Sequence, residues 1–230
     1  MTPERAGYEA LRRERPELFA NPEGAIVEIL TDPADVAWAE DAAAARLREA
    51  GLPEDLARTG VAYADQYLTL LRDAVRFPDG TPGTYIREVA PGAAPGVAVL
   101  PVFDGRVVLV DHFRHALRTW SLEIPRGFGE AGVTPEDSAR RELAEEIGAG
   151  AVQLTALGHL RVDSAMSADR VALFHAEIDR LGDLDTAEGI SGVRLVSVGD
   201  LAEMIAAATV DDGYTMAAFL RASLRGLLTG

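Results

Sequence analysis

The stretch GFGEAGVTPEDSARRELAEEIGA, residues 127–149, decides the fold, because it places a glycine-rich loop directly before an acidic helix. Thr134 can cap that helix, Pro135 suits its first turn and Gly148 can end it. The sequence therefore predicts a helix over about residues 134–148, with a loop in front of it that exposes backbone carbonyl groups.

Two stripes run along this predicted helix. Apolar residues recur every four positions and predict a buried face: Ala139, Leu143 and Ile147. On the adjacent stripe Glu142 and Glu146 also lie four residues apart, and Glu145 is three residues from Glu142. We therefore expect the three carboxylates to converge.

Converging carboxylates repel each other at a cost of roughly 0.2–0.5 kcal/mol per pair. Arg141 can offset part of this repulsion by pairing with Glu145, four residues on. A solvated charged face is the plain alternative. The loop EIPRGFGEAG, residues 123–132, favours a second interpretation, since carbonyl and carboxylate oxygens together suit Mg²⁺ or Mn²⁺.

Composition limits the classes of function. The 230 residues carry 37 acidic against 22 basic side chains, a formal charge of −15, and no cysteine. This balance argues against binding nucleic acid or an anionic membrane, and no apolar run reaches about 18 residues. The N-terminus lacks the apolar segment of a secretory signal, so we expect a cytoplasmic protein.

Along the chain, helical patterns come first and strand patterns follow. PDGTPG, residues 78–83, and Asp104-Gly105 each separate two strand-like runs and predict hairpins. We expect an α/β protein with three regions: a helical N-terminal extension over 1–60, a small β region over 61–95 and a main domain over 96–230.

The loop and helix over residues 127–149 resemble the box that defines the Nudix hydrolases. The glycine, arginine, glutamates and second glycine of that box stand at the expected spacing: Gly127, Arg141, Glu142, Glu145, Glu146 and Gly148. Val133 departs from the pattern, because the family has its first glutamate there. Glu130 lies close by and is the candidate to replace it.

The resemblance implies a Nudix-type α/β/α sandwich with a mixed sheet in the main domain, and hydrolysis of a diphosphate linked to a nucleoside. It assigns Glu142 and Glu146 as ligands of Mg²⁺ or Mn²⁺. Glu145 would be a ligand or a support through water, and the carbonyl of Arg126 a further ligand. Arg141 would orient the carboxylates.

The flanking sequence LVDHFRHALRTWSLEIPRG, residues 109–127, resembles the ADP-ribose pyrophosphatase group. Arg114 is then a candidate contact for the substrate phosphates, and Glu123 a candidate site residue. Downstream, DTAEGISGVRL, residues 185–195, resembles the loop that carries an acidic residue in that group. Glu188 is the candidate base or an added metal ligand, with Asp185 as its rival.

Aromatic and imidazole side chains near these motifs carry weaker signals. Trp120 and Tyr214 could stack on an adenine, but packing in the core is the interpretation that single aromatic residues favour. His112 and His115 are three residues apart on a predicted strand end, which does not by itself make a metal site.

The resemblance thus predicts metal-dependent cleavage of ADP-ribose to AMP and ribose 5-phosphate by a homodimer, with strands of about residues 65–90 helping to build the interface. Another nucleoside diphosphate sugar or a dinucleotide is the alternative substrate. A Nudix-fold nucleotide sensor without catalysis is the alternative class, and Val133 is the feature that favours it.

Overall fold

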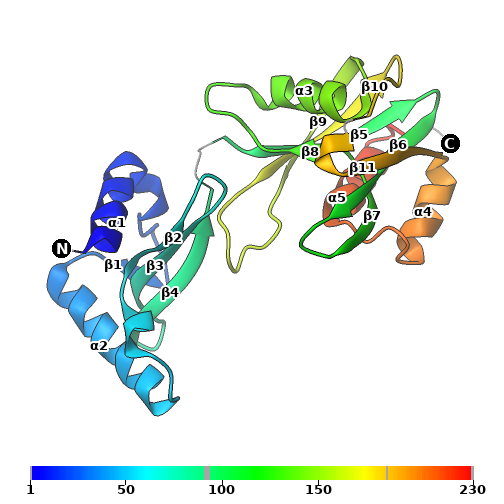
Figure 1. The fold of residues 1–230 in the computed structure, drawn as a ribbon. Coiled ribbons are helices and arrows are strands. Elements are labelled where there is room, and N and C mark those ends of the chain that lie inside the picture. Colours follow the sequence, from blue (N-terminus) through cyan, green and yellow to red (C-terminus); the bar gives the residue numbers. More distant parts are fainter. Residues whose placement is uncertain (1, 91–93, 185, 229–230) are drawn as a thin grey trace. The chain divides into compact units, whose positions relative to one another are not determined.

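The computed structural model describes residues 2–90, 94–184 and 186–228, and the chain divides into two compact units (Figure 1). The first unit comprises Met1–Pro91 and Asp163–Ala168, and the second comprises Gly92–Val162 and Asp169–Gly230. Among the described residues, none of the helices is long and apolar enough to cross a membrane.

A mixed seven-stranded sheet forms the centre of the second unit, in the order β11-β6-β5-β10-β9, with β7 beside β6 and β8 beside β5. The β5–β10 pair is parallel and the other pairs are antiparallel. The strands are β5 (Gly96–Phe103), β6 (Arg106–Arg114), β7 (Thr119–Glu123), β8 (Arg126–Gly127), β9 (Ala151–Leu160), β10 (Val171–Ile178) and β11 (Ile190–Val196).

Helices cover both faces of this sheet: α3 (Pro135–Ile147) on one side, α4 (Val198–Ala206) and α5 (Gly213–Leu224) on the other (Figure 1). Alternate residues of β5 enter two separate cores, since successive side chains of a strand point to opposite faces. Val97 and Val99 pack with Leu143 of α3, whereas Ala98 and Leu100 pack with the core of α4 and α5. The predicted α/β/α sandwich with a mixed sheet is confirmed.

The hairpin between β5 and β6 turns at the predicted dipeptide. Asp104 and Gly105 have φ values of 49° and 72°, the left-handed conformation that two-residue hairpin turns require. Because of this turn, the last residue of β6, Arg114, lies at the same end of the strands as the start of β5. At that end, β8 pairs with Val97 and Ala98 of β5.

The first unit joins two helices to a four-stranded antiparallel sheet. Its elements are α1 (Pro3–Glu14), β1 (Glu28–Leu30), α2 (Pro33–Glu49), β2 (Gly60–Ala64), β3 (Thr69–Arg76) and β4 (Pro82–Val89), with short 3-10 helices at Pro16–Leu18 and Glu54–Ala57. The predicted β3–β4 hairpin is present. Strand β1, of three residues, was not predicted.

This arrangement differs from the predicted division at residues 60 and 95. Tyr8 of α1 packs with Leu71 and Val89 of the sheet, and Ala39 of α2 packs with Ala74. The helices cannot form a separate region, because the apolar faces they bury are those of β3 and β4. The unit boundary falls between Pro91 and Gly92.

A buried ion pair lies inside the first unit. Asp73 of β3 is 1% exposed, and the Tyr8 hydroxyl donates a hydrogen bond of 2.5 Å to its Oδ1. The Arg87 guanidinium of β4 contacts the other carboxylate oxygen at 2.5 Å. Burial and the Asp73 charge raise the pKa of Tyr8 well above its usual range, so the hydroxyl stays a donor.

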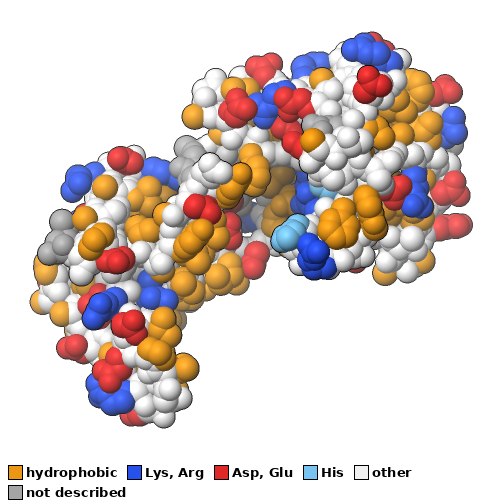
Figure 2. Space-filling model, viewed as in Figure 1, with side chains coloured by type: hydrophobic (Ala, Val, Ile, Leu, Met, Phe, Trp, Pro, Cys, Tyr) orange, Lys and Arg blue, Asp and Glu red, His pale blue; other side chains and the backbone are white. Residues whose placement is uncertain are grey.

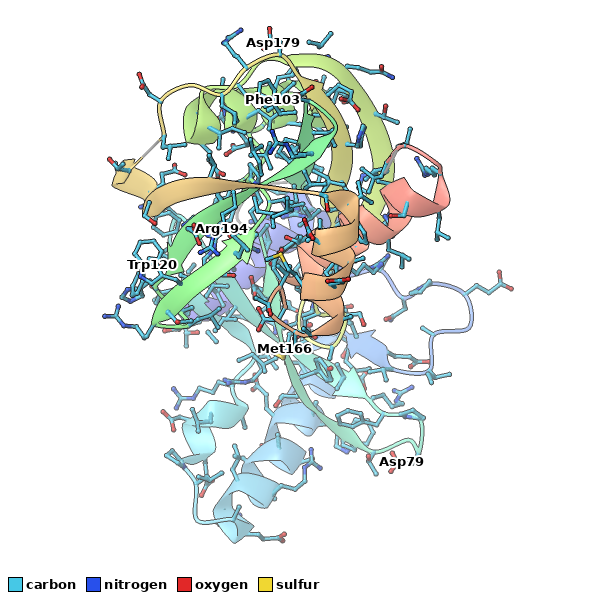
Figure 3. The ribbon with its side chains drawn as sticks, turned by 90° about the vertical axis from the view of Figure 1, so that its right-hand side faces the viewer. Asp79, Phe103, Trp120, Met166, Asp179 and Arg194 are labelled. Atoms are coloured by element: carbon cyan, nitrogen blue, oxygen red, sulfur yellow. The ribbon has the colours of Figure 1, made fainter. Side chains whose placement is uncertain are left out.

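Residues 163–168, between β9 and β10, belong to the sheet of the first unit. The Glu88 amide donates to the Met166 carbonyl at 2.7 Å, and the Tyr85 hydroxyl donates to the Ala165 carbonyl at 2.9 Å. Glu88 also forms a parallel bridge with Ser167. This short segment, marked by Met166 in Figure 3, therefore lies along the edge of β4.

Candidate active site

Helix α3 begins and ends as its sequence predicts. The Thr134 side chain accepts from the Asp137 amide at 3.1 Å, and Gly148 has a φ of 59° at the C-terminal end. Ala139, Leu143 and Ile147 are fully buried. Their burial fixes the rotation of the helix and turns the adjacent stripe, with Glu142 and Glu146, toward β8.

Glu146 is a buried carboxylate with few partners. It is 1% exposed, and the Arg126 amide donates to its Oε1 at 3.4 Å. Its Oε2 has no hydrogen-bond partner among the described residues. Burial raises the pKa of Glu146 to about 8, with the charges of Glu142 and Glu188 adding to the rise.

Glu142 lies one helical turn before Glu146 and is 6% exposed. Burial also raises its pKa, whereas the Arg141 guanidinium, which donates to its Oε1 at 2.9 Å, opposes that rise. A Cβ atom on Gly127 would overlap the Glu142 carboxylate. The backbone of strand β8 therefore passes directly over this carboxylate at Gly127, and a larger residue there would displace the end of the Glu142 side chain.

Arg141 connects the helix to the glycine-rich loop. Its guanidinium lies 2.5 Å from Glu130 and 3.5 Å from Glu145, and it donates to the Phe128 carbonyl at 3.2 Å. The predicted pairing with Glu145 is confirmed. Glu130 brings a carboxylate of the loop onto Arg141, although the box position itself is occupied by Val133.

Glu145 does not join the two buried carboxylates. Its side chain is 53% exposed, and no three carboxylate or imidazole groups of the described residues come together as a ready-made metal site. The expected convergence of all three glutamates is therefore absent from the structure. The reason is rotational: Glu145 lies on the flank of α3, where Arg141 holds it.

A second charged cluster lies at the ends of β6, β7 and β8. Glu123 is 1% exposed and forms a very close ion pair with Arg114. Arg126 approaches the same carboxylate, with its Nε 3.4 Å from Oε1. The two candidate residues Arg114 and Glu123 are thus in contact, a pairing that was not predicted, and Arg126 joins them.

Glu188 ends the 3-10 helix Thr186–Glu188, directly before β11, and its side chain is exposed. Its negative charge contributes to the raised pKa values of both Glu142 and Glu146. The structure therefore brings Glu188 within electrostatic reach of the two buried carboxylates. The rival candidate, Asp185, lies outside the described residues.

Comparison with known proteins connects this geometry to a family. The NUDIX domain model matches residues 92–219, which is more than half of the chain. The chain belongs to the Nudix family. It is accordingly a pyrophosphohydrolase that acts on a small nucleotide substrate, and Nudix hydrolases generally use divalent metal ions.

Two pyrophosphatases are similar to this chain in sequence. The chain is 32% identical over 160 residues to the ADP-ribose pyrophosphatase of Bacillus subtilis (strain 168), an alignment that covers 66% of this chain and 83% of that protein. It is 43% identical over 61 residues to the ADP-sugar pyrophosphatase of Mus musculus, covering 24% of this chain and 28% of that one.

A solved structure described as an ADP compounds hydrolase superposes with a TM-score of 0.65 at 19% identity, covering 74% of this chain and 93% of the other. At this identity the superposition shows the shared fold alone. It supports the architecture of layers around the Nudix helix α3.

The residues around this Nudix helix fit a hard divalent cation. Glu146 offers a buried oxygen without a partner, Glu142 lies beside it, and the backbone passes close to both at Arg126 and Gly127. The two carboxylates offer oxygen donors only, which suits Mg²⁺ or Mn²⁺. A cation there would also favour the ionised form of Glu146, which burial disfavours.

The side chain of Arg126 was missed by reasoning from the Nudix box, which concerned only its carbonyl group. The guanidinium lies 4.4 Å from the centre of the Tyr214 ring and 3.8 Å from Asp212. Thr215 accepts from the Ile124 amide at 3.0 Å, which fixes the start of α5 against this turn. The capping pattern DDGYT, residues 211–215, was the available signal.

Trp120 corrects another expectation. It is 54% exposed and projects from β7, with its ring edge-on to Phe113 at a centroid distance of 5.5 Å (Figure 3). Core packing was therefore the wrong interpretation of this tryptophan.

On the face shown in Figure 2, acidic and basic side chains are interspersed and form no continuous basic patch.

Proposed function

We propose that this Nudix enzyme hydrolyses the diphosphate bond of ADP-ribose to give AMP and ribose 5-phosphate, in the presence of Mg²⁺ or Mn²⁺. The observation that carries the proposal is Glu146, which lies beside Glu142 and has a buried oxygen without a hydrogen-bond partner in the part of the chain that the structure describes. A protein interior leaves a carboxylate so poorly satisfied mainly where a ligand completes it.

The metal would be held by Glu142, Glu146 and the Arg126 carbonyl, and the exposed Glu145 would support it through water. Such a cation neutralises the anionic diphosphate and makes a bound water more acidic. Arg141 fixes the positions of three carboxylates by forming ion pairs with Glu130, Glu142 and Glu145.

Glu188 is the proposed general base. In this role its carboxylate accepts a proton from the attacking water, whose oxygen bonds to one phosphorus atom. The bond between that phosphorus and the bridging oxygen breaks, and the bridging oxygen leaves with the other phosphate. Arg114 binds the phosphate oxygens, and Glu123 fixes the position of its guanidinium by their close ion pair. The reaction consumes only water and the substrate, so atoms and charge balance.

The identity of the substrate rests on two supports. One is the likeness to the ADP-ribose pyrophosphatase of Bacillus subtilis over most of that protein's length. The other is the Arg114–Glu123 pair in the segment that resembles this group. The mouse ADP-sugar pyrophosphatase favours a second candidate, another ADP-sugar.

We also propose a homodimer in which strands of about residues 65–90 contribute to the interface. Large aromatic side chains of the first unit are exposed in one chain, and they give such an interface apolar area: Tyr63, Tyr67 and Tyr85. Light scattering on a size-exclusion column tests this, and a monomer over the working concentration range would contradict it.

The central test is hydrolysis of a panel: ADP-ribose, other nucleoside diphosphate sugars, dinucleotides and nucleoside triphosphates, each with Mg²⁺, Mn²⁺ or chelator. We expect metal-dependent cleavage of ADP-ribose above the rest, with products identified by chromatography. The matched controls are Glu146→Gln, which should be inactive, and Glu136→Gln, an exposed glutamate of the same helix, which should be active. Metal binding without any cleavage would instead support a nucleotide sensor.

A further inference from the structure

His112 is a buried titratable residue that the proposed reaction does not use. It lies on β6, two residues before Arg114, and is 6% exposed. Its Nδ1 is 3.6 Å from Oε1 of Glu123, and it makes no hydrogen bond there among the described residues. The imidazole therefore lies against the carboxylate that holds the phosphate-binding arginine.

The other side of the ring faces the loop of the proposed base. The Nε2 and Cδ2 side of the ring faces Gly189, the residue that follows Glu188. Burial and the Arg114 charge lower the pKa of His112, so the ring is neutral near pH 7.

The backbone around this contact is fitted to the ring. Gly189 has a φ of 88°, and a Cβ atom there would lie 3.8 Å from Cδ2 of His112. Its carbonyl accepts from the Phe113 amide at 2.9 Å, and Ile190 pairs with His112 in the β11–β6 ladder. Gly189 and Ile190, the two residues that follow Glu188, are thus held by residues 112 and 113.

We propose that His112 is a positioning residue that holds the Glu188 loop at a fixed distance from the Arg114–Glu123 pair. This inference rests on the proposed role of Glu188. The imidazole is the connecting group, since one ring bridges the strand that binds the phosphate and the loop that carries the base. It acts through Glu188 and does not itself touch the substrate.

The first test is kinetic. We expect His112→Ala to lower kcat by about 10- to 100-fold with KM within about threefold, the size of effect typical of partners that orient a site residue. His112→Gln should recover most of the lost kcat, because its neutral polar side chain can fill the same space against Gly189. His115→Ala, an exposed histidine of the same hairpin, is the control and should equal the wild type.

A double substitution separates positioning from other effects. If His112 acts through Glu188, adding His112→Ala to Glu188→Gln should lower kcat little further. Multiplying effects would overturn the inference. So would a rise in KM at unchanged kcat, because that result would place the action of His112 on Arg114.

Amide hydrogen exchange tests the inference without turnover. The Phe113 amide should exchange faster in His112→Ala than in wild type or His115→Ala, with unchanged global stability by thermal unfolding. Faster Phe113 exchange in an enzyme that cleaves nothing on the panel would overturn the proposed function and keep the positioning contact. Unchanged exchange in His112→Ala would overturn the contact itself, whatever the activity.

Discussion

Asp73 in the first unit and Glu146 in the second are both 1% exposed, but the two buried carboxylates differ in their hydrogen-bond and ion-pair partners. In the first unit, Asp73 accepts from Tyr8 at 2.5 Å and pairs with Arg87 at the same distance. In the Nudix unit, the described residues give Glu146 one long hydrogen bond of 3.4 Å and leave its Oε2 without a partner.

The difference separates a carboxylate that is satisfied within the protein from one that the proposed metal ion would satisfy. A buried charge is stable when it is paired and hydrogen-bonded, and costly when it is not. Asp73 meets that condition within the protein and joins α1 to the sheet. Glu146 has no such pairing among the described residues, so its ionised form should destabilise the Nudix unit, and the proposed cation would offset that destabilisation.

The largest effect is expected from removing the charge of Glu146. Glu146→Gln keeps the shape of the side chain but should lower turnover about a thousandfold, since several kcal/mol of charge stabilisation at the site would be lost. Its thermal unfolding temperature without metal should equal or exceed that of the wild type. Rates like those of the wild type would remove Glu146 from the metal site.

The matching change in the first unit should have the opposite character. Asp73→Asn should lower the free energy of unfolding by about 3 kcal/mol, because it leaves the Arg87 guanidinium without its buried partner. Turnover per folded molecule should stay within about twofold of the wild type. Denaturant unfolding and active-site titration measure the two quantities, and unchanged stability would mean that the pair contributes nothing.

A smaller effect should follow from pH in metal-free protein. The folded pKa of Glu146, about 8, lies above the usual 4.5, so its contribution to stability is present below about pH 4.5 and is lost as pH rises toward 8. The wild type should therefore lose a few kcal/mol relative to Glu146→Gln across that window, and Mg²⁺ should restore it. Parallel curves for the two proteins would contradict this.

The smallest effect is expected at the departure from the Nudix box. Val133→Glu should leave turnover within about threefold of the wild type or raise it, because Glu130 already pairs with Arg141 at 2.5 Å. A loss of more than tenfold would show that this loop has been rebuilt for another purpose. The panel assay with saturating Mg²⁺ measures it.

Local signals predicted most of the Nudix unit. The cap at Thr134, the left-handed Gly148 and the Asp104-Gly105 turn each depend on a few neighbouring residues, and each is confirmed. The placement of Glu142 and Glu146 on one stripe beside the apolar stripe also followed from the four-residue spacing, whereas their burial was not predicted.

The remaining features depend on residues far apart in the sequence. Tyr8 and Asp73 are 65 positions apart, and no local pattern pairs them. The exposure of Glu145 and the stacking of Arg126 on Tyr214 depend on how α3 and α5 meet the turn at β8. The contact between His112 and the Glu188 loop likewise requires the β6–β11 register, which the sequence did not reveal.

The segment 163–168 has a consequence for how the chain is connected. Because it leaves the Nudix unit, pairs with Glu88 and returns, the polypeptide passes between the two units three times. A single cleavage at the boundary after Pro91 would therefore not release the first 91 residues from the native protein. A truncated enzyme starting at residue 92 would keep residues 163–168 but lose β4, the strand that they contact.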